Sequence, residues 1–595
     1  MAEKITIGAI IGTLRNEKCY SRRQVCYGLC TTQMLAKIEE DEADTDKLLL
    51  DQIIQRLGKS SDNLEIILSD EEYERIELRD EIEQLIWKKE TDAAYICMQK
   101  YIKAMPKNNA QAMFVKRTEA YICFKIEQDL IKSENIIRET IELTLPEVSY
   151  ANLNNYLISK MEMENILLLC HLLIMKNDIT QARWWLESCS LYINNMISDA
   201  IDQTQLNSKV AFLLSTVYIE SGDYMRAYEL CENAINDLRK YGILHFMLPL
   251  LEQMILCCER LGMELYKKKW KLYYDMLVKV YQEYGEPYYC HDSIFHNVYH
   301  MSFYLASELI RNERINRNIT QEELIEGVYE QPENLSRLEH GKTTPTKKKL
   351  ELLLDNLGLE RGKYNGTIIV DNFEVLEIKR EVDYLLGKGL IEDANNYIER
   401  MRKRIDGSKR MNRNALETYD IIIMTERGNL SEEEAYKKVN EILKKSYWQY
   451  NDRFYRVPFY NELLGLNMLN LLLKRMGRKE ESATLLMKIM DVAERSKLDN
   501  RYMSNILSLV IANINERVPD KDRCEQAIAY ELSCGKGSML YIHLFVLGDG
   551  INEKNAKREM IHMAFLMSDL FMRSKDNQQI IKKYYKETFG EILEN

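Results

Sequence analysis

Two parts of this chain repeat each other about 300 residues apart, and this repeat limits the fold more than any other feature. Leu35-Ala-Lys-Ile-Glu39 aligns with Leu335-Ser-Arg-Leu-Glu339, and Glu77-Leu-Arg-Asp-Glu-Ile82 aligns with Glu377-Ile-Lys-Arg-Glu-Val382. Arg15-Asn-Glu-Lys18 resembles Arg311-Asn-Glu-Arg314 in the same way. A nearly constant offset across several segments predicts two tandem versions of one unit.

The second copy contains two short helices joined by a turn. Thr320 and Glu323 have the spacing of a capping box, in which a hydroxyl and a carboxylate bond to free amides at a helix start. Pro332 suits the first turn of the next helix, and Gly341 suits the left-handed residue that ends it. Three leucines would face a small core: Leu324, Leu335 and Leu338. This layout predicts a helix-turn-helix.

These residues resemble the XRE-type (repressor-like) helix-turn-helix family. The residues that carry the resemblance are Arg311, Thr320-Gln-Glu-Glu-Leu324, Leu335-Ser-Arg-Leu-Glu339, Gly341-Lys342, Pro345 and Leu350. Tyr329-Glu330 departs from the family, which usually has a small turn residue and an apolar residue there. The resemblance implies that the chain binds double-stranded DNA.

The second copy has side chains suited to both bases and phosphates. Asn and Gln can bond adenine in two places and Arg can do so with guanine, which makes base-edge candidates of Gln331, Glu333, Asn334 and Arg337. Side chains expected near phosphates are Gln321, Lys342, Thr344, Lys347, Lys348 and Lys349.

The first copy is less suited to DNA binding than the second. Residues 40–46 hold five carboxylates, which would repel a phosphate backbone, where the second copy is basic. Its candidate DNA contacts are Arg22, Arg23, Thr32, Gln33 and Lys37. Whether this copy touches DNA stays open. Glu39 and Glu339 are expected to pair with Arg15 and Arg311 inside the two small cores.

The segments after each motif have helical apolar spacing. Residues 211–235, with Gly222-Asp-Tyr224 as a turn, resemble a tetratricopeptide (TPR) repeat. The fold class expected is all-α, with two tandem units that each join a helix-turn-helix domain to a TPR-like solenoid. The predicted domains are 1–68 and 302–362 for the motifs, and 69–301 and 363–595 for the arrays.

Composition excludes several classes of protein. The formal net charge of −12 rules out a uniformly basic surface, so any DNA contact must be local. The 13 cysteines lack zinc-ribbon spacing, and we expect reduced thiols. The sequence shows no signal-peptide pattern and no apolar run long enough to span a membrane, so a cytoplasmic protein is expected.

No enzyme, metal or cofactor signature stands out. No Ser/His/Asp or paired-carboxylate arrangement is evident, so we expect no enzymatic activity. Cys290, His291, His296 and His300 lie within a short stretch, and the last two are one helical turn apart. We interpret this stretch as a connecting helix and not as a metal site, and no cofactor is expected.

Asparagines in the arrays are candidates for gripping a peptide, because the amide can bond both the N–H and the C=O of a backbone. The candidates are Asn155, Asn195, Asn461, Asn505 and Asn513, with ordinary surface asparagine as the simpler reading.

An XRE-type motif joined to a repeat-like array resembles the RRNPP group of peptide-sensing (quorum-sensing) regulators. The resemblance implies a transcription regulator, controlled by a short peptide, that acts as a covalent pseudo-dimer. The alternative is an interaction adaptor whose motifs contact proteins, which the acidic residues 40–46 favour. Further self-association, the operator, the peptide and the sign of regulation stay open.

Overall fold

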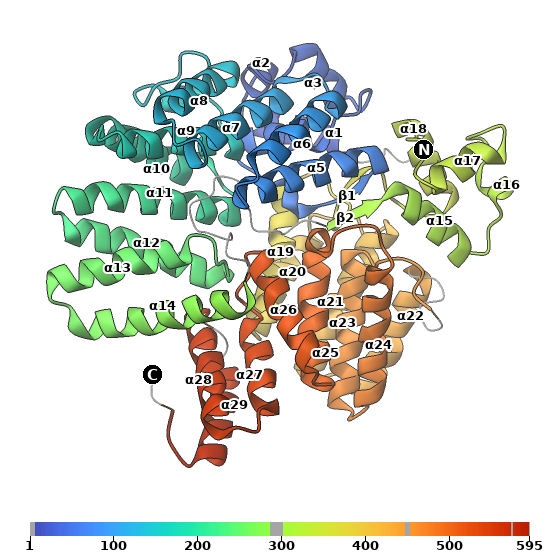
Figure 1. Cartoon of the computed structure of the whole chain (residues 1–595). Coiled ribbons are helices and arrows are strands. Elements are labelled where there is room, and N and C mark those ends of the chain that lie inside the picture. Colours follow the sequence, from blue (N-terminus) through green and yellow to red (C-terminus); the bar gives the residue numbers. More distant parts are fainter. Residues whose placement is uncertain (1–5, 286–301, 447–452, 573–574, 594–595) are drawn as a thin grey trace.

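The computed structural model describes residues 6–285, 302–446, 453–572 and 575–593, and most of them are helical (Figure 1). The first head consists of four short helices, α1 (Ile7–Glu17), α2 (Arg22–Cys26), α3 (Thr32–Glu39) and α4 (Lys47–Arg56). Ser21 and Gln24 form the expected capping box, while Thr31 and Asp46 cap α3 and α4. A 3-10 turn, η1 (Ser61–Asn63), leads into strand β1 (Leu64–Leu68).

The first array is a series of helices in which successive members pack side by side. Its paired helices α11 and α12 turn at Gly222, whose φ of +77° is left-handed, as the Gly-Asp-Tyr segment predicts. The elements are α5 (Asp70–Trp87), α6 (Thr91–Ala104), α7 (Asn109–Lys125), α8 (Leu130–Thr144), η2 (Leu153–Asn155), α9 (Lys160–Met175), α10 (Ile179–Met196), α11 (Ala200–Glu220), α12 (Tyr224–Tyr241), α13 (Met247–Leu261) and α14 (Glu264–Tyr284).

The second head projects to the right in Figure 1. It consists of α15 (Ala306–Asn316), α16 (Gln321–Leu324), α17 (Pro332–Glu339) and α18 (Lys347–Asn356), preceded by β2 (Ser302–Leu305) and followed by β3 (Tyr364–Gly366). The Thr320–Glu323 capping box is present, Pro332 begins α17, and Gly341 ends that helix region with a φ of +71°. The local signals for this head are therefore confirmed.

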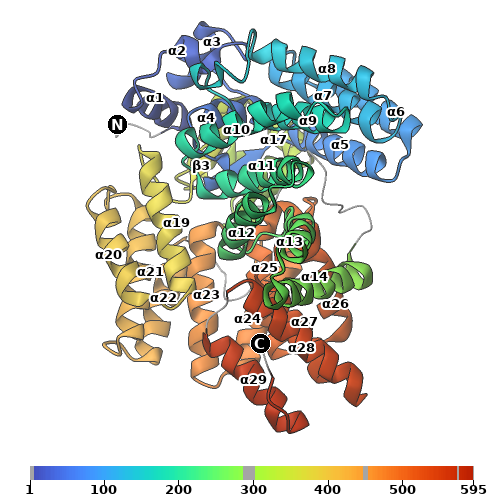
Figure 2. The same ribbon diagram turned by 90° about the vertical axis from the view of Figure 1, so that its left-hand side faces the viewer.

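In Figure 2 the second array lies below α5–α11 of the first array, and α12–α14 lie level with α19–α25. Its elements are α19 (Phe373–Gly387), α20 (Ile391–Arg402), α21 (Arg410–Glu426), α22 (Glu432–Ser446), α23 (Tyr460–Arg475), α24 (Lys479–Glu494), η3 (Asn500–Met503), α25 (Ser504–Arg517), α26 (Lys521–Ser533), α27 (Leu540–Gly550), α28 (Lys554–Leu570) and α29 (Lys575–Phe589). None of the described helices combines the length and apolarity that a membrane crossing requires.

A small three-stranded sheet corrects the all-α expectation. Its order is β2-β1-β3, with β1 parallel to β2 and antiparallel to β3. Every residue of β1 is buried, and the run Leu64-Glu-Ile-Ile-Leu68 has the apolar, β-branched character of a covered strand. The sheet joins strands from the two halves of the chain.

The antiparallel register in this sheet is reciprocal. Glu65 lies opposite Asn365, and Leu64 lies opposite Gly366 while Ile66 lies opposite Tyr364. With an offset of 300, Glu65 faces its own counterpart Asn365, while Leu64 faces the counterpart of Ile66 and Ile66 faces the counterpart of Leu64.

A second contact between the halves has the same reciprocity. Ile243 forms an isolated antiparallel β-bridge with Lys536, and the segments that hold them correspond at an offset of 293, because Gly242 precedes Ile243 and Gly535 precedes Lys536. Leu244 donates its N–H to the carbonyl of Gly535 at 2.9 Å, and Gly537 donates to the carbonyl of Gly242 at 2.8 Å. Around this contact, α12–α14 and α26–α29 share one apolar core.

Candidate nucleic-acid interface

The second head is organised around a compact apolar core. The side chains of Leu324, Leu335 and Leu338 are buried, as their spacing predicts, and Leu350 of α18 is buried with them. Helix α15 packs against α17 and α18, and α16 packs against α17. This packing fixes one face of α17 and leaves the opposite face to solvent.

The exposed face of α17 carries the predicted base-edge candidates. Gln331 is the N-cap residue of α17, Glu333 and Asn334 lie in its first turn, and Arg337 lies one turn further on. All four side chains are exposed. The structure therefore brings these four together, at the part of the helix that would enter a major groove.

The predicted phosphate contacts are in different environments. Lys342, Thr344 and Lys348 are exposed, while Lys349 lies over the ring of Tyr329 at 4.4 Å from its centre. Lys347 forms an ion pair with Asp41 of the first head. Lys342 and Lys348 are therefore exposed to solvent, whereas Lys347 already has an acidic partner.

Glu339 is held by Arg314, so the expected partner Arg311 is wrong. Arg314 donates Nε and Nη2 to the Glu339 carboxylate at 2.6 and 2.9 Å, and Gln321 donates its amide at 2.7 Å. Arg311 and Arg314 are three residues apart on α15, and so lie near one another on the helix surface. The alignment with Arg15 was therefore displaced by about one turn.

The corresponding pair in the first head is confirmed. Arg15 donates to Glu39 at 2.6 and 2.9 Å, and Arg22 donates to it at 2.7 Å. Burial acts to raise the pKa of Glu39, but the hydrogen bonds from the two guanidinium groups outweigh it and lower that pKa. Both carboxylates therefore hold the small helices of their heads together.

The first head also presents polar side chains to solvent. Arg23, Thr32, Gln33 and Lys37 are exposed. Arg22 is half-buried and is shared between Glu39 and Glu40, which lies 3.3 Å away. Four of the five predicted DNA contacts are thus accessible, and the fifth already has acidic partners.

The acidic residues 40–46 reach the second half of the chain, which the sequence did not reveal. Asp41 pairs with Lys347, and Asp44 lies 3.3 Å from the ammonium group of Lys363. A Cβ added to Gly341 would lie 2.3 Å from the carboxylate of Asp70, so the second head closely approaches the start of α5. The two heads are held near one another by opposite charges.

The heads dock on their arrays through different elements. The buried Arg56 of α4 forms an ion pair with Glu162 of α9, and its Nε donates to that carboxylate at 3.0 Å. In the second half, Arg456 joins Glu313 of α15 to Glu462 of α23, at 2.9 and 2.8 Å. The first head is therefore attached through its last helix and the second through its first.

The asparagine candidates are dispersed and do not converge on one site. Asn155 lines a cavity of about 350 Å³ beside Arg23, and Asn195 is exposed on α10. Asn461 donates to the carbonyl of Thr367, and Asn513 donates to Leu509 of its own helix at 2.8 Å. Asn505 lies in α25, but its side chain is not among those that the structure describes.

No group of three or more His, Cys, Asp or Glu with a metal-binding arrangement occurs among the described residues. The Cys290, His291, His296 and His300 stretch lies outside them.

Comparisons with known proteins identify one segment. A search of curated proteins gave no match. A crystal structure of Bacillus thuringiensis PlcR in complex with the peptide PapR7 and DNA is similar at 13% identity and a TM-score of 0.30, covering 48% of this chain and 99% of that one. A circular tandem repeat protein with novel repeat topology is similar at 14% identity and a TM-score of 0.15, covering 98% of each chain. Residues 310–363 match the helix-turn-helix family, and this segment is a helix-turn-helix domain.

Proposed function

We propose that this protein is a DNA-binding transcription regulator. The observation that carries the proposal is the helix-turn-helix match over residues 310–363, together with the exposed polar face of α17. Asn334 and Arg337 have the donor geometry for adenine and guanine edges. The exposed Lys342 and Lys348 supply the local positive charge that an acidic chain needs for binding phosphates.

The chain acts as a covalent pseudo-dimer of two duplicated units, residues 1–301 and 302–595. In each unit the head ends and the array begins, after residue 68 in the first and after residue 362 in the second. Two reciprocal contacts support this proposal, the Glu65–Asn365 strand pair and the Ile243–Lys536 bridge. A contact between equivalent patches is what a local twofold axis requires. In such an arrangement, the second head binds DNA at high effective concentration once the first is bound.

A short peptide is the proposed effector. The supporting observation is a cavity of about 180 Å³ between the first head and the first array, closed partly by Phe303 and Tyr502 from the second half. Its polar lining includes both charges: Arg79, Asp80, Glu83, Arg117, Lys160, Glu164 and Asp202. Arg117 with Glu164, Lys160 with Asp202 and Asp80 with Arg501 already form ion pairs. Arg79 and Glu83 are the charges of opposite sign that we assign to a peptide's termini, and a ligand there would touch both halves of the chain.

The second candidate function is a protein-interaction adaptor. The ion pair between Asp41 and Lys347 favours it, because one predicted phosphate contact is already occupied by a carboxylate. In this reading, the heads contact proteins, and the arrays grip a partner.

A gel shift distinguishes the two functions. The probe is the promoter DNA upstream of the protein's own gene, and Arg337→Ala is compared with the matched control Arg413→Ala, whose side chain is exposed on α21. A regulator shifts the promoter, loses that shift in Arg337→Ala and keeps it in the control. An adaptor gives no specific shift with any of the three proteins.

Mass spectrometry of small molecules that co-purify with the protein tests the effector separately. A peptide bound in equal molar amount agrees with the proposal. If saturation with such a peptide left DNA affinity unchanged, peptide control would be rejected, whereas DNA binding would stand.

A further inference from the structure

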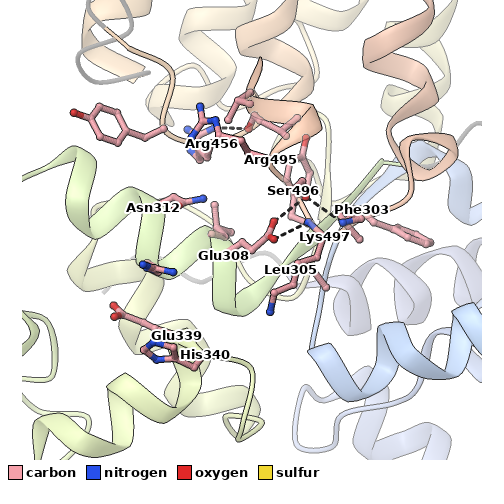
Figure 3. A pocket seen from close by; sticks show the side chains of 17 residues that line it. Phe303, Leu305, Glu308, Asn312, Glu339, His340, Arg456, Arg495, Ser496 and Lys497 are labelled. Atoms are coloured by element: carbon pink, nitrogen blue, oxygen red, sulfur yellow. Dashed lines mark hydrogen bonds between the residues drawn. The ribbon is translucent and has the colours of Figure 1, made fainter. Parts of the chain in front are cut away.

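A cavity of about 320 Å³ lies between the second head and the second array (Figure 3). It is bounded by β2, α15 and the end of α17 on one side, and by residues 455–457 and 492–498 on the other. Its volume is in the range of sites for small molecules. None of the candidate DNA contacts or peptide-binding asparagines lines it, although Phe303 also borders the cavity proposed for the peptide.

The inner wall of the cavity is apolar. Six buried side chains form it: Phe303, Leu305, Leu309, Val457, Val492 and Leu498. This wall can cover a small hydrophobic group but offers a ligand no polar contact.

Most charged groups that line the cavity already have opposite charges as partners. The pairs are Arg456 with Glu313 at 2.9 Å, Arg495 with Asp491 at 2.8 Å, Lys497 with Asp70 at 3.3 Å and Glu339 with Arg314 at 2.6 Å. These groups are neutralised within the protein, and so they do not determine the charge of a ligand.

Two charged groups on α15, Glu308 and Arg311, form no ion pair with the residues that the structure describes. Among the described residues, Glu308 accepts hydrogen bonds from two neutral donors, the Ser496 hydroxyl at 2.7 Å and the Lys497 backbone N–H at 2.8 Å. Arg311 is exposed and forms no hydrogen bond or ion pair with any residue that the structure describes. Asn312 lies half-buried beside them and faces the cavity (Figure 3).

We propose that this cavity binds a small zwitterion of the α-amino-acid class. Its carboxylate is held by Arg311, its ammonium by Glu308, and its apolar side chain by the wall around Leu309 and Val492. Residues three apart on a helix have Cβ atoms about 5–6 Å apart, so one small ligand can reach both charges. A purely anionic or cationic ligand would leave one of the two charges without a partner.

The site has a consequence for the second head. A ligand here contacts α15 on one side and residues 455–457 and 495–498 of the array on the other. Occupancy would restrict the head relative to the array, and so change its DNA affinity. This consequence rests on the proposed function, whereas ligand binding itself does not.

Isothermal titration calorimetry of the full chain tests the site. The probes are L-leucine, L-methionine and L-phenylalanine, and we expect saturable binding of at least one. N-acetyl-L-leucine lacks the ammonium and L-leucinamide lacks the carboxylate. Each blocked form should bind about tenfold more weakly, because it loses a charge-assisted hydrogen bond.

Variants assign the two contacts. Arg311→Gln should weaken amino-acid binding about tenfold, but leave the already weak binding of L-leucinamide nearly unchanged. Glu308→Gln should do the same with respect to N-acetyl-L-leucine. The matched controls Arg413→Gln and Glu417→Gln change exposed side chains of α21 and should bind as wild type does.

Two results overturn the proposal. One is the absence of binding by all three amino acids at millimolar concentration. The other is binding that both variants leave unchanged, with normal thermal unfolding showing that the variants are folded. A failed promoter gel shift would reject the regulator function and leave these ligand results standing.

Discussion

Replacing Asp41 with asparagine should strengthen DNA binding. Lys347 begins α18 and is a predicted phosphate contact, but its ammonium group is paired with Asp41. The two side chains are 21% and 25% exposed, so water screens the pair only in part. In the proposed complex, Lys347 must leave Asp41 before it can bind a phosphate.

The size of the effect follows from that pair. A hydrogen bond to a charged group contributes about 1.5–3 kcal/mol, and partial exposure favours the lower end. Asp41→Asn removes about 1.5 kcal/mol of attraction that competes with the phosphate for Lys347, which should raise DNA affinity by about tenfold. Glu42→Gln removes the same charge from the next residue, which is exposed, and screening should limit its effect to about twofold.

Fluorescence anisotropy with a labelled promoter duplex measures both affinities at one salt concentration. The gain in Asp41→Asn should disappear when Lys347→Gln is added, because the competing cation is then absent. Equal gains for Asp41→Asn and Glu42→Gln would refute the reasoning, since net charge alone would then explain them.

Three further predictions concern the heads and the first array. Arg337→Ala should weaken promoter binding by about 1–3 kcal/mol and Lys37→Ala by less, as measured by anisotropy; equal losses would mean that both heads read DNA. Glu162→Gln leaves the Arg56 guanidinium buried without its carboxylate and should cost about 3 kcal/mol, seen as a lower thermal midpoint and faster proteolysis of the first head. Burial, aided by a neighbouring carboxylate, raises the pKa of Asp62 to about 7. Between the ordinary carboxyl pKa of about 4 and pH 7, the folded state binds more protons than the unfolded state. Stability should therefore fall as the pH rises through this window, and Asp62→Asn should flatten this slope in calorimetric scans.

The heads were predictable because their signals are local. Thr320 and Glu323 cap one helix, and Leu335 and Leu338 have the spacing that buries one face of the next. Such signals depend on residues within a few positions of each other. The position of Arg337 on the exposed face follows from the same spacing.

The contacts between the halves were not predictable, because they join residues far apart in the chain. Nothing near Asp41 indicates that its partner is Lys347, and nothing near Glu65 indicates Arg361. The β1 strand was missed for a similar reason, since its partners β2 and β3 lie in the other half. The wrong partner for Glu339 has a different cause. Arg311 and Arg314 lie three residues apart on one helix face, so the sequence alone does not tell which of them reaches Glu339.

Joining both halves in one chain permits an asymmetry that a homodimer lacks. On the proposed axis, a homodimer would place two copies of one side chain opposite each other, and two glutamates there would repel. Here Glu65 faces Asn365 and instead accepts hydrogen bonds from Arg361 at 2.6 Å and from the hydroxyl of Tyr304 at 3.0 Å. The counterpart of Arg361, 300 residues earlier, is Ser61, which cannot form such an ion pair. The ion pair between Glu65 and Arg361, at the centre of the proposed pseudo-dimer, therefore requires halves that differ in sequence. The same difference in sequence makes residues 40–46 of the first head acidic, whereas the corresponding segment of the second head is basic.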